Sequence, residues 1–255
     1  MSAILSIENL SVRFGGLVAV NDFSMEVEEG SVHALIGPNG AGKSTIFNAI
    51  SRFVRPSDGS ITFDGRPVLP LAAHDLVAAG IGRTFQNTEL LHRMTVLENV
   101  LVGLDRRIPG YMPFGPSRRR GRAEVQAVRD AEEILDQAGL RPYRDALAGE
   151  LDFGRQKLLD LARALAGAPR LLLLDEPAAG LRNREISFVD ALLVDLARRR
   201  KLTIVLVEHV MQLVMSVADR ITVVNFGQKI AEGSPADVRN DARVIEAYLG
   251  SAAHA

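Results

Sequence analysis

The chain has 255 residues, of which 47% are hydrophobic, so it can bury the core of one large domain or of a domain with a subdomain. It has no cysteine, which excludes disulfides and thiolate metal sites, and its formal net charge of -1 gives no general attraction to nucleic acid or anionic membrane. No apolar run approaches the roughly 20 residues of a membrane helix, and no basic region precedes an apolar stretch at the N-terminus. We therefore expect a soluble globular protein without a signal peptide and without nucleic-acid partners.

The first part of the chain, residues 4–70, is rich in strand-forming residues. Residues 60–63 and Val68 flank the sequence Asp-Gly-Arg-Pro at residues 64–67, which predicts a turn between two strands. We expect an antiparallel sheet that precedes and surrounds a glycine-rich loop.

That loop, Gly37-Pro38-Asn39-Gly40-Ala41-Gly42-Lys43-Ser44-Thr45, fits the phosphate-binding pattern G-x-x-x-x-G-K-[ST] at every fixed position. Its small residues let successive N–H groups point at phosphate oxygens, Lys43 can reach the terminal phosphates, and Ser44 offers Mg2+ a hydroxyl. A buried strand predicted at residues 32–36 enters the loop, and a helix predicted at residues 45–50 leaves it with its positive end toward the site. The loop therefore predicts that the chain binds a nucleoside triphosphate.

From about residue 95 to residue 150 the pattern is helical. Thr95 and Glu98 have the spacing of a capping box, and residues 108–116 contain three prolines and predict a loop. A long helix is predicted at residues 123–138, with apolar positions at Val125, Val128, Ala131, Ile134 and Leu135. We expect one domain over residues 1–255, with a helical subdomain inserted at approximately residues 90–165.

In the last hundred residues, helices alternate with apolar strands at Leu171–Asp175 and Thr203–Val207, as a parallel sheet requires. The first strand ends in Asp175 and Glu176. Asp175 is placed to hold Mg2+, directly or through water, and Glu176 to accept a proton from the attacking water, although two adjacent acids can also form a solvated turn. His209 follows the second strand and could contact the γ-phosphate, although a lone histidine is usually structural.

The order of these motifs resembles that of the ATP-binding subunits of ABC transporters, and the resemblance covers essentially the whole chain. The segments that carry it are Phe14, the phosphate loop, Gln86 in Arg83-Thr84-Phe85-Gln86-Asn87, the helical insert, a signature segment at Leu151-Asp152-Phe153-Gly154-Arg155-Gln156, the paired acids, Ala178-Ala179-Gly180-Leu181 and His209. Within the family, residues 14–20, 94–100, 175–181 and 244–250 are similar to the ATPase subunits of bacterial branched-chain amino-acid uptake transporters.

This resemblance implies an α/β fold with a P-loop NTPase (RecA-like) core, an antiparallel β subdomain and a helical subdomain insert. It implies an ATPase, peripheral at the cytoplasmic face of the plasma membrane, that energises import of branched-chain or related amino acids through transmembrane permease subunits. A periplasmic or extracytoplasmic binding protein would act indirectly. A soluble ABC ATPase outside transport and a nucleotide-binding scaffold with weak turnover are the alternatives.

The resemblance also implies roles for single residues, with ATP and Mg2+ as the bound groups. Phe14 would stack on adenine, although it could be a core phenylalanine. Gln86 would sense water or Mg2+, which Ser44 and Asp175 also hold, although it could be a surface glutamine. The arginine-rich run at residues 118–122 predicts a solvated face or a contact with anionic lipid or an acidic surface.

In the family the signature segment, usually Leu-Ser-Gly-Gly-Gln, closes over ATP held by a second ATPase subunit, so hydrolysis needs a head-to-tail dimer. Here Gly154 is kept, while Asp152 replaces the serine and Arg155 the glutamine. Asp152 would repel the γ-phosphate of the partner's ATP, or it would cap the helix at Phe153–Ala166, or both. The sequence leaves these alternatives open, and also the choice between a homodimer and a heterodimer.

Overall fold

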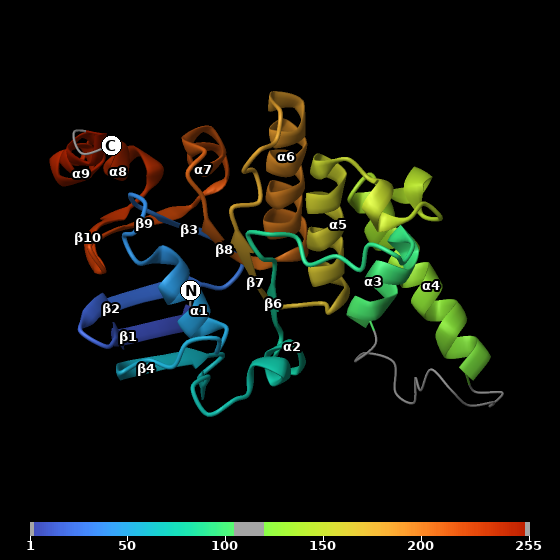
Figure 1. The fold of residues 1–255 in the computed structure, drawn as a ribbon, viewed down its shortest axis with the longest axis horizontal. Helices are drawn as coiled ribbons and strands as arrows, with labels where there is room; N and C mark the ends of the chain where they lie inside the picture. Colours follow the sequence, from blue (N-terminus) through green and yellow to red (C-terminus); the bar gives the residue numbers. More distant parts are fainter. Residues whose placement is uncertain (1–2, 105–119, 253–255) are drawn as a thin grey trace.

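The computed structural model describes residues 3–104 and 120–252 (Figure 1). Its strands and α-helices follow one another in the order β1 (Ala3–Phe14), β2 (Leu17–Glu28), β3 (Val32–Ile36), α1 (Lys43–Ile50), β4 (Asp58–Phe63), β5 (Arg66–Pro67), α2 (Leu76–Ala79), β6 (Ile81–Arg83), α3 (Val96–Leu104), α4 (Arg120–Gln137), α5 (Phe153–Ala166), β7 (Leu171–Asp175), α6 (Asn183–Arg200), β8 (Thr203–Val207), α7 (Met211–Val217), β9 (Arg220–Asn225), β10 (Gln228–Gly233), α8 (Pro235–Asn240) and α9 (Ala242–Ala252). In these two described ranges, no helix combines the length and the apolar character that crossing a bilayer would take.

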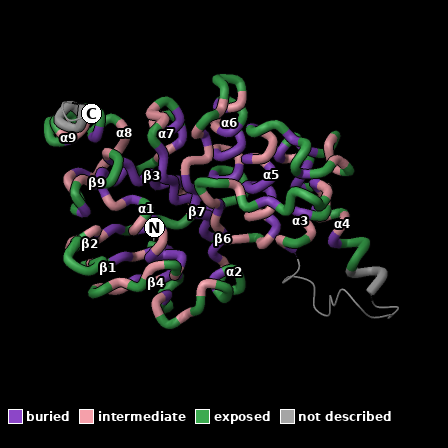
Figure 2. The backbone as a smooth tube through the Cα atoms, in the orientation of Figure 1, coloured by how far each residue is buried: buried purple, intermediate pink, exposed green. Residues whose placement is uncertain are grey.

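A six-stranded sheet runs through the middle of the molecule in the order β10-β9-β3-β8-β7-β6 (Figure 1). All neighbouring pairs are parallel except β9 with β10. Strands β3, β7 and β8 are buried at every residue, as Figure 2 shows for the centre of the sheet, so they appear in the sequence as unbroken apolar runs. All three expected strands are confirmed with the expected bounds. Because parallel strands end at the same edge, the loops that follow β3, β7 and β8 are brought together there.

Separate apolar cores cover the two faces of this sheet. On one face, α1 packs Ile46, Phe47 and Ile50 against the second, antiparallel sheet, which has the order β2-β1-β4-β5. On the other face, α6 buries residues such as Leu193 and Leu196 against β7 and β8. The expected α/β architecture with an antiparallel β subdomain is thus confirmed.

The hairpin between β4 and β5 is tighter than the sequence predicts. Arg66 already pairs with Phe63, and Pro67 pairs with Thr62, so the turn consists of two residues, Asp64 and Gly65. Both have positive φ, at 51° and 71°, which is the geometry that an Asp-Gly pair favours in a two-residue hairpin turn. The prediction that all four residues 64–67 form the turn is therefore wrong for Arg66 and Pro67.

Helices α3, α4 and α5 pack around a core of their own on the side of the molecule away from the antiparallel sheet (Figure 1). The predicted capping box is confirmed, since Glu98 accepts from the Thr95 N–H at 2.7 Å and Thr95 Oγ1 accepts from the Glu98 N–H at 3.2 Å. The predicted apolar face of α4 is wrong at Val125, which is 54% exposed, because the helix turns Ala127 toward the core instead.

Two predictions for this region fall wholly or partly on residues outside the described ranges. The proline-rich loop at residues 108–116 lies outside the described residues, and so do Arg118 and Arg119 of the arginine-rich run. Helix α4 begins at Arg120.

His33 on β3 gives the fold a predicted sensitivity to acid. Its ring is buried, Nε2 lies 2.8 Å from Thr222 Oγ1, and burial lowers the pKa of His33 from 6.5 to about 4. Below pH 6.5 the unfolded chain therefore binds a proton that the folded chain excludes, so stability falls as the pH falls toward 4. We expect this residue to cost about 2 kcal/mol of unfolding free energy between pH 7 and pH 5.

Urea unfolding at both pH values measures this cost, with His33→Gln as the variant that cannot be protonated. The variant should lose about 2 kcal/mol less than the parent between the two pH values. Equal losses would show that His33 does not titrate as its burial requires.

Candidate active site

The phosphate loop connects β3 to α1 through a backbone that needs glycine. Gly42 has φ of 103°, and a Cβ there would lie 2.7 Å from the carbonyl oxygen of Ala19. At Gly37, where φ is 152°, a Cβ would lie 2.0 Å from the Val224 carbonyl oxygen. Pro38, Asn39, Gly40 and Ala41 complete the loop, and its tip at Asn39 and Gly40 is exposed. The backbones of β2 and β9 therefore leave no room for a side chain at Gly42 and Gly37, while the tip of the loop stays exposed.

The start of α1 has the properties of an anion site. Its N-cap, Gly42, offers no side-chain acceptor, so the first amides of the helix are available to a ligand. Lys43 Nζ donates to the carbonyl oxygens of Gly37 and Pro38, at 2.7 and 2.8 Å, and burial lowers the pKa of Lys43 while Glu176 and Asp175 oppose that shift. A phosphate would give this buried ammonium a charged partner. The loop thus fits the triphosphate that its sequence predicts.

Ser44 and Thr45 follow Lys43 at the start of α1, where the Ser44 side chain is exposed. The Ser44 hydroxyl is therefore open to a metal ion. Among the described residues, no group of three His, Cys, Asp or Glu side chains could hold a metal alone.

Asp175 is the last residue of β7 and lies inside the molecule. Its Oδ2 is 3.3 Å from Arg83 NH2, and both side chains are largely buried. Burial raises the pKa of Asp175, and the Arg83 guanidinium opposes that rise. The Asp175 carboxylate is thus already held by one cation, which a metal ion would join or replace.

Two other predicted site residues, Gln86 and His209, meet at Glu176. Its Oε2 accepts from Gln86 Nε2 at 3.0 Å, and its Oε1 lies 3.7 Å from His209 Nδ1. The backbone of Glu176 is left-handed, with φ of 51°, which is uncommon for a residue with a side chain. The loops after β6, β7 and β8 therefore bring Gln86, Glu176 and His209 to one place.

Phe14 ends β1 with its ring 50% exposed, so it is not the core phenylalanine that the sequence left possible. It pairs with Leu17 at the tip of the hairpin formed by β1 and β2. Ala19 of the same hairpin approaches Gly42, so this tip lies beside the phosphate loop. An exposed ring in this place is available for stacking.

Asp152 and Gly154 lie at the start of α5. Asp152 caps the helix, because its Oδ1 accepts from the Arg155 N–H at 2.9 Å, and its Oδ2 pairs with the Arg155 guanidinium. A Cβ on Gly154 would lie 2.5 Å from Glu185 Oε1 of α6. In the described chain these contacts join α5 to itself and to α6, not to the phosphate loop.

Two polar residues behind the site were not singled out from the sequence. Thr84 Oγ1 accepts from the Asp175 N–H at 3.3 Å, and Glu208 accepts from the Ala178 N–H at 2.8 Å and from the His209 N–H at 2.8 Å. Thr84 and Glu208 directly follow β6 and β8, so a polar residue at the end of a buried strand is the signal that could have found them.

Comparison with known proteins gives these motifs a context. A family model described as "ABC transporter" matches residues 20–179, and one described as "Branched-chain amino acid ATP-binding cassette transporter" matches residues 228–254. The chain is 42% identical over 253 residues to the high-affinity branched-chain amino acid transport ATP-binding protein BraF of Pseudomonas aeruginosa, and the alignment covers 98% of each chain.

Solved structures agree with these matches. The ADP conformation of MJ1267, an ATP-binding cassette of an ABC transporter, has a TM-score of 0.85 and 33% identity, covering 98% of this chain and 100% of that one. A dimeric post-hydrolysis structure of the cassette MJ0796, bound to ADP and Pi, has a TM-score of 0.78 and 26% identity, covering 91% and 98%.

Proposed function

We propose that this chain, which belongs to the ABC transporter family as an ATP-binding and ATP-hydrolysing subunit, energises the import of branched-chain or related amino acids. The observation that carries the ATPase part of the proposal is the convergence at Glu176, where Gln86 and His209 meet a carboxylate at the sheet edge that also bears the phosphate loop. The amino-acid part rests on the likeness to BraF and on the C-terminal match at residues 228–254.

Each residue of the site has a proposed task in hydrolysis. Phe14 stacks on the adenine ring, and the amides of the phosphate loop with Lys43 bind the β- and γ-phosphates. Glu176 takes the proton of the attacking water, while the Gln86 amide and the His209 ring hold that carboxylate and face the γ-phosphate. Mg2+, when bound by Ser44, Asp175 and Gln86, supplies positive charge that offsets the charge developing on the transferred phosphoryl group.

The site is proposed to be completed by a second ATPase subunit. Asp152 and Gly154 lie away from their own phosphate loop, and a related cassette is dimeric. This chain's own Lys43, Asp175 and Glu176 would be completed by the partner's signature segment, whereas Asp152 would face the partner's ATP. A homodimer would carry that aspartate at two sites, so we propose a heterodimer with a distinct ATPase subunit.

Replacing Asp152 tests the proposal that this aspartate faces the partner's ATP, and the structure offers a matched pair of variants. Asp152→Ser and Asp152→Asn both keep an N-cap for α5, but neither brings a negative charge to the partner's γ-phosphate. We expect each to raise the steady-state ATPase rate of the isolated chain about two- to tenfold, since Arg155 and solvent already screen part of the repulsion. Unchanged or slower rates in both variants would leave capping as the only role of Asp152.

Permease subunits are proposed to dock in a groove beside the Gln86 loop. The groove is lined by Val77, Ile81, Phe85, Val102, Arg163 and Pro169, so it lies between α2, β6, α3 and α5. Val77 and Val102 are 40% and 47% exposed, which gives the groove apolar side chains for a partner to cover. Docking there would place the chain at the cytoplasmic face of the plasma membrane. It would also bring the permease next to the loop of Gln86, the residue that contacts Glu176.

The experiment that tests the proposed function is to purify the chain with co-expressed permease subunits and measure ATPase rates with a series of extracytoplasmic binding proteins. We expect stimulation by a binding protein loaded with leucine, isoleucine, valine or a related amino acid. Stimulation only by a protein loaded with an unrelated solute would contradict the amino-acid assignment, while leaving the ATPase assignment intact.

A further inference from the structure

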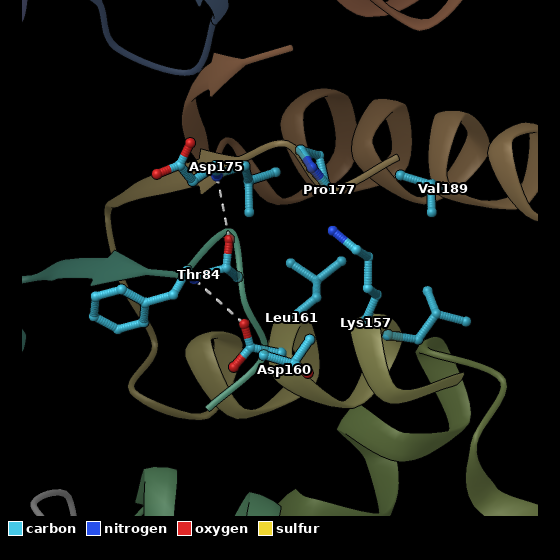
Figure 3. A pocket seen from close by; sticks show the side chains of 11 residues that line it. Thr84, Lys157, Asp160, Leu161, Asp175, Pro177 and Val189 are labelled. Atoms are coloured by element: carbon cyan, nitrogen blue, oxygen red, sulfur yellow. Dashed lines mark hydrogen bonds between the residues drawn. The ribbon is translucent and has the colours of Figure 1, made fainter. Parts of the chain in front are cut away.

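Behind the paired acids lies a buried lysine of α5 to which the proposed chemistry gives no task. Lys157 is only 8% exposed, and it shares a small cavity with Thr84, Asp160, Asp175 and Pro177. Figure 3 shows its side chain extending from α5 toward Pro177, away from Asp160. A buried ammonium is costly unless its donors are used, so the position of Lys157 needs an explanation.

The ammonium of Lys157 is used on the backbone of Glu176. Its Nζ donates to the Glu176 carbonyl oxygen at 2.7 Å, and the only other described donor to that oxygen is the Ala179 N–H at 3.2 Å. On the other side of the residue, the Glu176 N–H donates to the Val207 carbonyl oxygen at 2.8 Å. Lys157 and β8 therefore hold the two ends of a residue whose left-handed backbone is uncommon for glutamate.

Opposite charges surround this contact. Burial lowers the pKa of Lys157, and the carboxylates of Glu208, Glu176, Asp160 and Asp175 oppose that shift. Glu208 itself accepts from the Ala178 N–H, two residues after Glu176. Residues 176–179, which we call the catalytic turn, are thus held by a buried cation on one carbonyl and by a buried anion on one amide.

The same lysine connects the catalytic turn to the signature segment. Its Nζ lies 5.5 Å from the centre of the Phe153 ring, in the first turn of α5. That ring leaves no room beside Gly180, where a Cβ would lie 2.8 Å from Phe153 Cε1. A displacement at the start of α5 would therefore move Lys157, the one of these groups that α5 carries.

We propose that Lys157 is a positioning residue for ATP hydrolysis, which fixes the catalytic turn through the Glu176 carbonyl and makes the orientation of the Glu176 carboxylate depend on the start of α5. This proposal rests on the proposed role of Glu176. Because the ammonium touches the backbone of Glu176 and not the phosphate loop, its loss should slow hydrolysis and leave ATP affinity unchanged.

The first experiment compares Lys157→Met with Lys229→Met, which removes a surface lysine paired with Glu232, in the full chain with its partner subunits. Lys157→Met should lower kcat about 10- to 100-fold, with the Kd for ATP within about twofold, while Lys229→Met should change neither. Lys157→Arg, which can still donate to the carbonyl, should restore the rate to within about fivefold of the parent. A kcat for Lys157→Met within twofold of the parent would overturn the proposal.

A double variant separates positioning from general damage to the fold. If Lys157 acts through Glu176, adding Lys157→Met to Glu176→Gln should not lower the residual single-turnover rate further. Multiplied effects of the two changes would overturn the proposal. Should Lys157→Met not fold, the same cycle is run with Lys157→Gln, whose side chain is one bond shorter and does not reach the carbonyl. A Glu176→Gln chain as fast as the parent would instead contradict the role of Glu176 itself.

Discussion

Changing Glu176 to glutamine is expected to lower ATP hydrolysis about 10²- to 10⁴-fold without weakening ATP binding, because the amide keeps the shape of the side chain but cannot accept a proton. Gln86 Nε2 and the ring of His209 surround this carboxylate, so the variant removes the base and leaves its neighbours in place. With hydrolysis blocked, the ATP-bound dimer should accumulate and elute earlier from a sizing column.

The matched control is Glu29→Gln, which makes the same chemical change at a surface carboxylate paired with Arg170. Glu29→Gln should hydrolyse ATP at the parent rate, since exposed ion pairs of this kind contribute little. If Glu176→Gln hydrolyses as fast as Glu29→Gln, another residue activates the water.

Lys43→Ala is expected to have the second large effect, on binding as well as on turnover. In the structure the Lys43 ammonium is buried and donates to two carbonyl oxygens of its own loop. We expect it to donate to the charged phosphate oxygens instead when ATP binds, because hydrogen bonds between two charged groups are stronger. Its removal should weaken ATP binding about 100-fold or more, as measured by the fluorescence of a labelled nucleotide. Full ATPase activity in Lys43→Ala would contradict the phosphate-loop assignment.

The strands that bear the site could be predicted because the candidate site residues directly follow the apolar runs that form buried strands. Strands β3, β7 and β8 are apolar at nearly every position, and each is followed at once by a glycine-rich or a charged segment. A buried run that ends in a glycine-rich loop or in two acids has few alternatives. The signature helix α5 was predicted with its observed bounds, and its start follows from Asp152, which is a good N-cap.

The contacts behind the site could not be predicted in the same way. Arg83 and Asp175 are 92 residues apart in the chain, and Lys157 lies on a helix whose polar positions look alike in the sequence. Periodicity shows that a helix has a buried face, but not which lysine turns inward to a carbonyl. The same limit explains Val125, an apolar residue at helical spacing that the packing of α4 leaves on the surface.

Uptake by reconstituted vesicles tests the central claim that ATP hydrolysis at Glu176 drives import. Proteoliposomes that contain the permease subunits, the partner ATPase subunit and this chain are supplied with ATP at the cassette side and with a labelled branched-chain amino acid on its binding protein at the other. We expect accumulation of the label with the parent chain, and none with Glu176→Gln, although the variant still binds ATP. Accumulation that is as fast with Glu176→Gln as with the parent would contradict the claim.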